Sequence, residues 1–427
     1  MIFPKILVVS NNVFSDTTNN GKTLMSFFEN YDPNRIAQLY FQDEVPTFKI
    51  TKYFFQINDV DILKSILLMR KVCGRQVKAK GTRKNVKYKY FLNFINIIKD
   101  FQIIRLIREI LWIFNTWKCP SLYQWLSKFS PDIIYFCAGD SGFAYEVVNW
   151  IRINFHCKLA VYITDDYVLP RSTLSIFWWI RRYYILQKMK KTIQNCSKLF
   201  VISPKMNNEY RKLFGRESTI IMNLSDDLRD PTIKRNGEIL VLTYTGGFHF
   251  KRYEILRLLG QFINIYNSQY KEKKALLNIY SGTIPSKFIL NKINIDGASR
   301  FCGSLNKEQL KETLNKSNIL VFVESFDRKS IESTRLSLSS KIPEYLSVGK
   351  PILAIGPDVI SSIQYLKDVA FCITDLKSFY SKLAKFLLDS ELRKNLAEAA
   401  LRKYQMNHKK EKLQKMFMDQ IIKLKYE

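Results

Sequence analysis

The chain has 427 residues and a mass of 50.4 kDa, which at roughly 150 residues per domain predicts two or three domains. Apolar residues make up 47% of the chain, enough to build packed cores, so wholesale disorder is excluded. With 67 Lys and Arg against 38 Asp and Glu, the formal net charge is +29. That excess indicates an anionic partner, which is a nucleic acid, an acidic membrane surface or a phosphorylated substrate.

The positions of the cysteines and histidines argue against a disulfide-bonded or metal-binding protein. The seven cysteines form no C-x-x-C pair and the three histidines are scattered, so neither a disulfide scaffold nor a metal site is expected. The apolar run at the start is too short for a signal peptide, and we expect no membrane span. Together these features favour a reducing cytoplasm.

The first half of the chain alternates short apolar runs with helical stretches. It opens with a β-branched run, followed by a turn-rich segment and a helix from about Leu24. The runs expected to be strands are 6–10, 132–136, 159–163 and 198–202. Strands that alternate with helices predict parallel pairing in a doubly wound α/β sheet.

A second α/β series follows a polar break. Residues 223–237 are polar, contain Pro231 and end in Asn-Gly, which is typical of a linker. The later runs expected to be strands are 239–244, 275–280, 319–323, 352–355 and 369–373. We therefore predict a first Rossmann-like domain at 1–228, a linker at 229–237 and a second Rossmann-like domain at 238–390. The C-terminal helices at 391–427 would follow, and one possible arrangement packs them against the first domain.

Glycine is scarce and falls mainly just after predicted strands. Ligands of open parallel sheets bind beyond the carboxyl ends of the strands, where backbone must approach the ligand closely. Each glycine alone is also explained by an ordinary tight turn, but the set favours a ligand cleft between two domains. These glycines are Gly21, Gly139, Gly142, Gly246, Gly247, Gly282, Gly303 and Gly356.

The strongest local motif is TGGFHFKR, residues 245–252, directly after the first strand of the second half. Gly246 and Gly247 expose backbone N–H groups, a helix N-terminus follows, and Lys251 and Arg252 add positive charge. This combination suits a phosphate group. It is not GxGxxG, so dinucleotide binding is not supported, and a generic Gly-Gly turn remains the alternative.

A second motif is SSKIPEYLSVGKPIL, residues 339–353. Ser339, Ser340 and Lys341 lead into a short helix that carries Glu344 in its first turn. The serine backbone and Lys341 can hold a phosphate, while Glu344 can accept hydrogen bonds from a sugar diol. A serine-capped helix with an exposed glutamate is the structural alternative.

These two motifs, about 100 residues apart, resemble the donor half of family 4 glycosyltransferases, retaining enzymes of the two-domain GT-B fold. The segments ILVVSNN, NNGKTL, SPDIIYF, YITDDY and LFVISPKM are similar to the acceptor half, so the resemblance spans nearly the whole chain. It implies a nucleotide-sugar donor, two Rossmann-like domains facing a central cleft, and neither a metal nor another cofactor.

The resemblance also implies roles for individual residues. Glu344 matches the second glutamate of the E-x7-E motif, which binds the nucleotide ribose. Lys251, Arg252 and Lys341 resemble the basic residues that bind the diphosphate. The donor-binding set is Gly246, Gly247, His249, Lys251, Arg252, Gly303, Ser339, Ser340, Lys341 and Glu344, the acceptor-binding set is Asn20, Gly21, Lys22 and Thr23, and the catalytic set is Asp165, Asp166, Arg252 and Lys341.

The sequence departs from that family at one position. Leu336 stands eight residues before Glu344, where the first glutamate of E-x7-E belongs. Glu324 and Glu332 are near but lack the spacing. A catalytically inactive nucleotide-sugar-binding partner subunit is therefore an alternative to an enzyme.

One further motif suggests a metal site. Asp59-Val-Asp61 has the DxD form that binds metal in the other glycosyltransferase fold, but it starts a helical run and does not end a central strand.

The positive charge is concentrated in the first half. Residues 62–130 hold 15 Lys and Arg against two acidic residues, a net +13. The neighbouring segments 92–114 and 177–184 join basic residues to large apolar and Trp side chains, which is typical of an interfacial membrane contact. Core helices beside a solvated loop are one alternative. A nucleic-acid-binding surface is another, but its aromatic residues would form a stacking surface, so no nucleic acid is expected.

We therefore predict a retaining, metal-independent glycosyltransferase that moves a sugar from a nucleotide-sugar to a lipid-linked oligosaccharide. It would lie at the inner face of the cell membrane, bound to an anionic membrane surface, in surface polysaccharide assembly such as capsule, exopolysaccharide or O-antigen.

Overall fold

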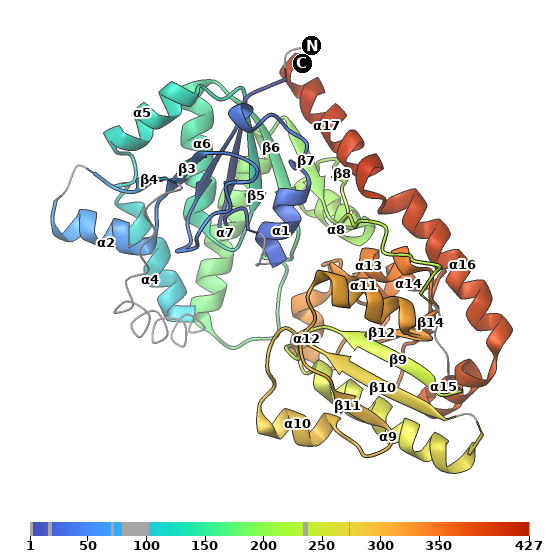
Figure 1. Cartoon of the computed structure of the whole chain (residues 1–427). Helices are drawn as coiled ribbons and strands as arrows, with labels where there is room; N and C mark the ends of the chain where they lie inside the picture. Colours follow the sequence, from blue (N-terminus) through green and yellow to red (C-terminus); the bar gives the residue numbers. More distant parts are fainter. Residues whose placement is uncertain are drawn as a thin grey trace. The chain divides into compact units, whose positions relative to one another are not determined.

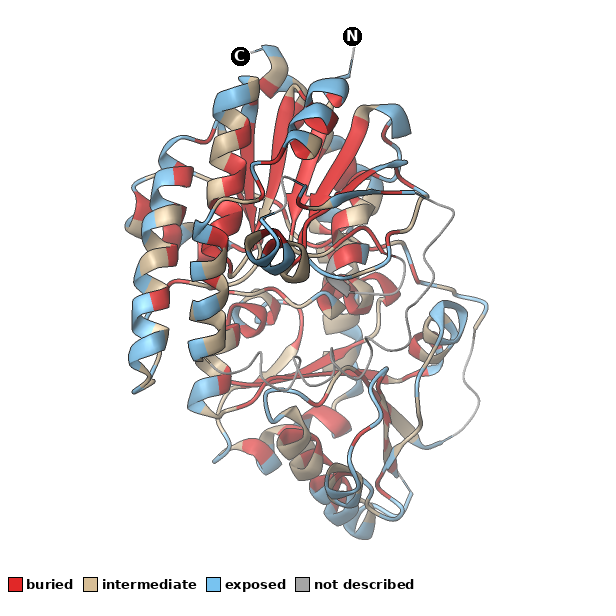
Figure 2. Cartoon of the chain, turned by 90° about the vertical axis from the view of Figure 1, so that its left-hand side faces the viewer, coloured by how far each residue is buried: buried red, intermediate tan, exposed pale blue. Residues whose placement is uncertain are grey.

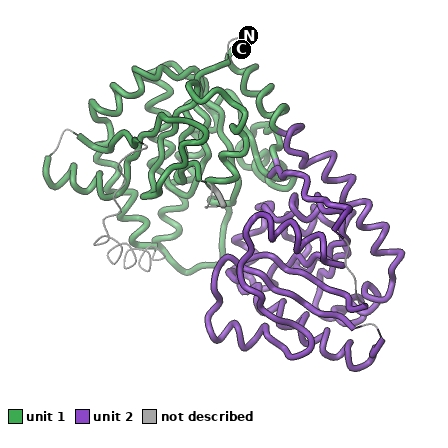
Figure 3. The backbone as a smooth tube through the Cα atoms, in the orientation of Figure 1, with its two compact units in different colours: residues 1–221, 414–427 green, residues 222–413 purple. Residues whose placement is uncertain are grey.

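The computed structural model describes residues 3–15, 19–69, 72–78, 102–233, 238–272 and 274–426, without the side chains of 19 and 20. The chain divides into unit 1, residues 1–221 and 414–427, and unit 2, residues 222–413 (Figures 1 and 3). The expected domain boundary was residue 228. Residues 234–237 of the expected linker lie outside the described residues.

Unit 1 is built on an eight-stranded sheet of order β4-β3-β2-β1-β5-β6-β7-β8. All its pairs are parallel except the edge pair β3–β4. Strand β1 is buried along its whole length, which explains its continuous apolar run. The strands are β1 Ile6–Ser10, β2 Ile36–Tyr40, β3 Tyr53–Gln56, β4 Arg75–Val77, β5 Ile133–Ala138, β6 Lys158–Ile163, β7 Lys198–Val201 and β8 Thr219–Ile220.

The helices of unit 1 cover the strongly buried strands (Figure 2). Phe417, from the C-terminal helix α17, packs among Phe27, Phe28 and Tyr135 in tilted and edge-on ring contacts with centroids 5.1 to 5.4 Å away, so the end of the chain completes this core. The helices are α1 Asn19–Ser26, α2 Asp59–Leu67, α4 Gln102–Ile113, α5 Pro120–Phe129, α6 Gly142–Phe155, α7 Ile176–Gln194, α8 Pro204–Phe214 and α17 Lys410–Tyr426, which starts in unit 2.

Unit 2 has a fully parallel six-stranded sheet of order β11-β10-β9-β12-β13-β14. Its strands are β9 Leu240–Thr245, β10 Ala275–Tyr280, β11 Ser299–Phe301, β12 Ile319–Val323, β13 Ile352–Ile355 and β14 Phe371–Ile373. Its helices are α9 Arg252–Gln269, α10 Lys287–Ile293, α11 Lys307–Lys316, α12 Arg328–Thr334, α13 Lys341–Val348, α14 Ser361–Leu366, α15 Phe379–Leu388 and α16 Ser390–Asn407. Strands alternate with helices as the sequence predicts.

Part of the basic and aromatic region expected at a membrane lies outside the described residues, namely 70, 71 and 79–101. Trp112 of α4 is buried and does not face outward: its ring stacks on Phe143 with centroids 3.8 Å apart, and its Nε1 donates to Asp59 at 2.9 Å. The opposite face of α4 exposes Ile103, Ile107, Ile110 and Ile113. No described helix is both long and apolar enough to cross a bilayer.

The Asp59-Val-Asp61 motif has a structural role at the start of α2. Asp59 accepts hydrogen bonds from Arg108 as well as from Trp112, and Asp61 completes a capping box with Asn58. These contacts occupy both carboxylates. Within the described part of the chain, no three His, Cys, Asp or Glu side chains gather into a metal-binding group.

Candidate functional site

The candidate site lies at the carboxyl edge of the unit 2 sheet, between β9 and β12. From β9 the chain runs outward through β10 and β11, and it then returns to β12 on the other side of β9. The carboxyl ends of neighbouring strands at such a topological switch point form the usual ligand-binding crevice of parallel α/β sheets. The Gly-Gly loop leaves β9 at this edge, and Glu324 follows the last residue of β12.

The Gly-Gly loop is shaped by close side-chain contacts. The Tyr244 hydroxyl donates to the Gly247 carbonyl at 2.7 Å, and the Gly246 N–H donates to the Tyr280 carbonyl at 3.0 Å. A Cβ at Gly246 would lie 2.5 Å from the Tyr244 oxygen, and one at Gly247 would lie 2.6 Å from a ring nitrogen of His249. The loop therefore requires glycine at both positions unless these rings move.

The loop leads into α9 through a tight turn. Phe250 and Lys251 are both left-handed, with φ of 57° and 55°, and α9 starts at the next residue. This turn brings the Arg252 side chain back over the loop, where its Nη1 lies 2.8 Å from His249 Nε2. Burial and the nearby Arg252 lower the pKa of His249, which leaves the ring neutral and able to accept from the guanidinium.

Arg252 forms a buried ion pair with Glu324. Its Nε and Nη2 donate to the Glu324 carboxylate at 2.8 to 3.2 Å, and the glutamate side chain is only 3% exposed. Burial raises the pKa of Glu324, and the nearby charge of Arg252 opposes that rise. For Arg252, burial acts to lower the pKa, but attraction to Glu324 outweighs it and the pKa is raised. A carboxylate therefore already neutralises the arginine expected at the diphosphate.

The other two cations expected at the diphosphate also have acidic neighbours. Lys251 Nζ donates to Asp327 at 2.6 Å, and this hydrogen bond lowers the pKa of the aspartate. Lys341 Nζ lies 3.5 Å from Glu344 Oε2. Both lysines remain partly exposed, so they can still reach a bound anion.

Glu344 lies in the first turn of α13, beside the end of β9. The next residue, Tyr345, is buried, and its hydroxyl accepts from the Thr245 N–H at 2.9 Å. This bond ties α13 to the strand that carries the Gly-Gly loop. Glu344 Oε2 is buried and makes no hydrogen bond within the described part of the chain. Since a buried carboxylate oxygen normally has donors, this atom is suited to receive them from a ligand.

The remaining residues expected on the donor side take supporting positions. Ser339 accepts from the Lys341 N–H with its hydroxyl at 3.3 Å, and its own N–H donates to Ser362 at 3.1 Å. Ser340 is exposed at the N-cap of α13. Gly303 is left-handed, with φ of 91°, and its carbonyl accepts from the Ser281 N–H at 2.9 Å.

The residues expected on the acceptor side belong to unit 1. Gly21, Lys22 and Thr23 lie within α1, which starts at Asn19 and not near Leu24; the Asn20 side chain lies outside the description. Directly after this helix, Phe27 and Phe28 pack their rings against the core residues Phe417 and Tyr135.

Asp165 and Asp166 follow β6 in unit 1. Asp166 is buried and accepts from the N–H groups of Val168 and Leu169 at 3.1 and 2.9 Å, so its carboxylate shapes the loop. Asp165 is half-buried and accepts from the Thr164 hydroxyl at 3.1 Å.

Three site residues were missed in the sequence: Glu324, Asp327 and Tyr345. Glu324 carried a signal, because it is an acidic residue directly after a buried strand. It was not assigned to the site because it lacks the spacing of the E-x7-E motif.

Comparison with solved structures identifies the fold. The Anabaena protein HepE in complex with UDP aligns at a TM-score of 0.60 and 12% identity, over 98% of this chain and 99% of that one. The trehalose-phosphate synthase of Burkholderia xenovorans aligns at 0.60 and 11% identity, over 97% and 99%. A Rickettsia africae glycosyltransferase aligns at 0.58 and 10% identity, over 98% of each chain. The chain has the GT-B fold. No protein-family model matches the sequence, and no curated protein matches it.

Proposed function

We propose that the chain is a glycosyltransferase that binds a nucleotide-sugar on unit 2. The observation that carries this proposal is the buried Glu344 Oε2 without a hydrogen-bond partner in the described residues, held beside the Gly-Gly loop by Tyr345. In this proposal Glu344 accepts from the ribose hydroxyls. The loop N–H groups, Lys251 and Lys341 bind the diphosphate, and Arg252, neutralised by Glu324, fixes the His249 side of the loop. UDP is the first nucleotide to test, because HepE binds it on the same fold.

The proposed reaction exchanges one C–O bond for another. The bond between the anomeric carbon and the diphosphate oxygen breaks, and its electron pair leaves with the nucleoside diphosphate. The acceptor hydroxyl oxygen bonds to the same carbon on the same face, with retention, and its proton passes to the departing diphosphate. Lys251 and Lys341, with the loop N–H groups, stabilise the negative charge that develops on that leaving group.

Unit 1 is proposed to bind the acceptor, a lipid-linked oligosaccharide in surface polysaccharide assembly at the inner face of the cell membrane. Gly21 to Thr23 and Asp165 are the candidates for acceptor contact. Two helices support a peripheral membrane position: α4 exposes four isoleucines along one face, and α7 exposes Ile176, Ile180 and Tyr183. Apolar side chains at helical spacing beside basic residues are what an interfacial helix needs.

A second candidate is a non-catalytic subunit that binds nucleotide-sugar. The buried Leu336 favours it, since no carboxylate occupies the position of the first motif glutamate. The two candidates differ in turnover. An enzyme releases nucleoside diphosphate when donor and acceptor are both present, whereas a binding subunit does not.

Thermal unfolding in the presence of nucleotide-sugars and nucleoside diphosphates tests the proposal. A ligand that binds the native state at 100 times its Kd stabilises it by about 2.7 kcal/mol, so one nucleotide class should raise the Tm. Glu344→Ala, which is expected to weaken binding about tenfold, should cut this stabilisation to about half at the same ligand concentration. Glu312→Ala, an exposed glutamate paired with Lys316 on α11, is the matched control and should keep it. Absence of any rise at millimolar ligand would overturn the proposal.

A further inference from the structure

A pocket rich in arginine lies in unit 1, beside the loop that carries Asp165 and Asp166. Four arginines and one aspartate line it, which leaves a surplus of three positive charges among the lining residues. Asp140 follows β5, Arg171 follows β6, Arg105 comes from α4, and Arg181 and Arg182 come from α7. Since β5 and β6 are parallel, the pocket lies at the carboxyl edge of the unit 1 sheet.

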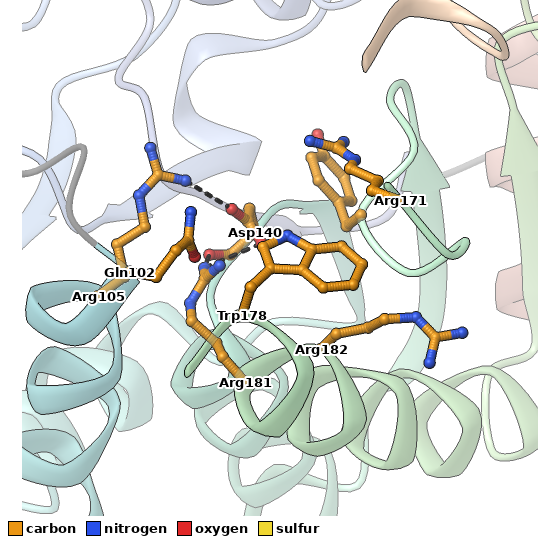
Figure 4. A pocket seen from close by; sticks show the side chains of 8 residues that line it. Gln102, Arg105, Asp140, Arg171, Trp178, Arg181 and Arg182 are labelled. Atoms are coloured by element: carbon orange, nitrogen blue, oxygen red, sulfur yellow. Dashed lines mark hydrogen bonds and ion pairs between the residues drawn. The ribbon is translucent and has the colours of Figure 1, made fainter. Parts of the chain in front are cut away.

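The arginines are positioned by hydrogen bonds and ion pairs within the protein, and Figure 4 shows those that join Arg105 and Arg181 to Asp140. Arg105 and Arg181 both pair with Asp140, at 3.1 and 2.9 Å. Arg171 donates to the Asp166 carbonyl at 2.9 Å, and Arg182 donates to the Val168 carbonyl at 2.6 Å. Guanidinium groups held in this way lose little side-chain freedom when an anion arrives, which favours binding.

Two buried polar atoms at the pocket have no hydrogen-bond partner in the described residues. Arg181 Nε is one of them, on a side chain that is only 6% exposed, and it lies 3.9 Å from a Glu109 carboxylate oxygen. Gln102 Oε1 is the other. Glu109 itself accepts from the N–H groups of Gly142 and Phe143 at the start of α6, so its charge is shared with that helix. The pocket therefore offers both a donor and an acceptor to a ligand.

The Trp178 indole stands among these arginines and adds an apolar wall (Figure 4). Positive charge next to an aromatic surface suits an organic phosphate, whose anion and carbon skeleton need different surroundings. The same two helices, α4 and α7, carry the exposed isoleucines proposed to contact the membrane.

We propose that this arginine pocket binds the phosphate or diphosphate group of the acceptor substrate. The inference rests on the proposed function, because it assigns an anionic acceptor to the transferase. It gives a role to the four arginines that α4, α7 and the segment after β6 bring together.

The test titrates inorganic pyrophosphate into the full chain with UDP at saturation, and the heat of binding is measured. Arg105→Gln with Arg171→Gln should weaken pyrophosphate binding by about 100-fold, since each variant removes a charge-assisted contact that contributes about tenfold. Arg211→Gln, an exposed arginine of α8 paired with Glu217, is the control and should keep wild-type affinity. Equal affinity in all three proteins, or no pyrophosphate binding, would overturn the proposal.

Vesicles separate the two sources of phosphate. If the wild type ignores pyrophosphate, and the double variant loses binding only to phosphatidylglycerol vesicles, then the pocket holds a membrane headgroup and the acceptor assignment is wrong. UDP binding is measured first, without pyrophosphate, and its failure would contradict the donor site alone. Unchanged Tm and UDP affinity in the double variant show that its fold is intact.

Discussion

The two units differ in how far acidic residues neutralise the positive charge at the carboxyl edges of their sheets. At the carboxyl edge of the unit 2 sheet each cation has an acidic neighbour: Arg252 has Glu324, Lys251 has Asp327 and Lys341 has Glu344. At the carboxyl edge of the unit 1 sheet, four arginines share a pocket with one aspartate. The unit 2 site is nearly neutral before a ligand arrives, and the unit 1 pocket is cationic.

This difference shows that a basic residue in a ligand motif does not by itself supply charge to the ligand. Arg252 stands in the most suggestive motif of the sequence, yet its guanidinium is committed to a buried carboxylate. The unit 2 edge is suited to a ligand held by hydrogen bonds from N–H groups and by Glu344. The unit 1 edge is suited to one held by its charge.

The strongest test of the comparison removes one side of the buried pair. Glu324→Gln leaves Arg252 without its counter-charge, and breaking a buried pair in this way costs about 3 kcal/mol or more. We expect the free energy of unfolding of unit 2, measured in urea, to fall by that amount. The double variant Arg252→Met with Glu324→Leu should recover most of it, because an apolar pair requires no desolvation of charge.

Glu312→Gln is the control for this experiment, since its pair with Lys316 is exposed and contributes within about 0.5 kcal/mol. If Glu324→Gln unfolds in urea like the wild type, Arg252 is not committed to Glu324 and the contrast between the two edges fails.

Acid should lower the stability of unit 2 through His408, which is buried there. Its Nδ1 donates to the Asn223 carbonyl at 2.7 Å and its Nε2 accepts from Tyr365 at 2.8 Å, so the bonds fit a neutral ring, and burial lowers its pKa to about 4. The unfolded chain takes up a proton below about pH 6.5 and the folded unit does not. Its stability should therefore fall from pH 6.5 to pH 4, by about 3 kcal/mol at 1.36 kcal/mol per pKa unit.

Urea unfolding at several pH values measures this loss. His408→Gln should flatten the histidine part of the slope, while His156→Asn, at an exposed left-handed position that asparagine tolerates, should retain it. An unchanged slope in His408→Gln would show that the ring is not held neutral.

Glu344 should matter for nucleotide binding and not for the arginine pocket. Glu344→Ala removes the acceptor proposed for the ribose hydroxyls, and losing hydrogen bonds to a charged group should weaken nucleotide binding by about tenfold or more. Calorimetry with UDP measures the loss. Pyrophosphate binding to unit 1, titrated in the same variant, should stay at the wild-type level; a parallel loss would mean that one site serves both ligands.

The smallest effect is expected at the apolar face of α7. Ile180→Ser removes an exposed apolar side chain proposed to enter the membrane interface, and it should weaken binding to phosphatidylglycerol vesicles by about fivefold, corresponding to about 1 kcal/mol. Ile265→Ser, an equally exposed position on α9 of unit 2, is the control for sedimentation with vesicles. Equal losses in both variants would remove α7 from the membrane contact.

The sequence predicts the central strands well because their apolar runs are continuous. It misses β2, where Gln38 interrupts the run; that side chain is buried and bonds to the Ser10 hydroxyl and the Phe14 N–H, both at 2.9 Å. The strands β3, β4, β8 and β11 are missed as well, and in β4 only Val77 of the three residues is buried. Partners that satisfy a buried polar group come from distant segments and leave no local pattern.

The parts of the candidate site that lie within one short segment could be predicted from the sequence, and the parts that join distant segments could not. The Gly-Gly loop and the Glu344 helix each lie within one short segment, and their composition identifies them. The Arg252–Glu324 pair joins residues 72 positions apart, and the arginine pocket gathers side chains from four separate segments. Only the sheet order brings these residues together.

Amide hydrogen exchange with and without UDP tests the central claim most directly, because it locates the nucleotide without altering a residue. We expect slower exchange in 245–252 and 339–345 of unit 2 and unchanged exchange in 140–142 and 165–171 of unit 1. Protection confined to the unit 1 segments, or no protection at saturating UDP, would contradict it.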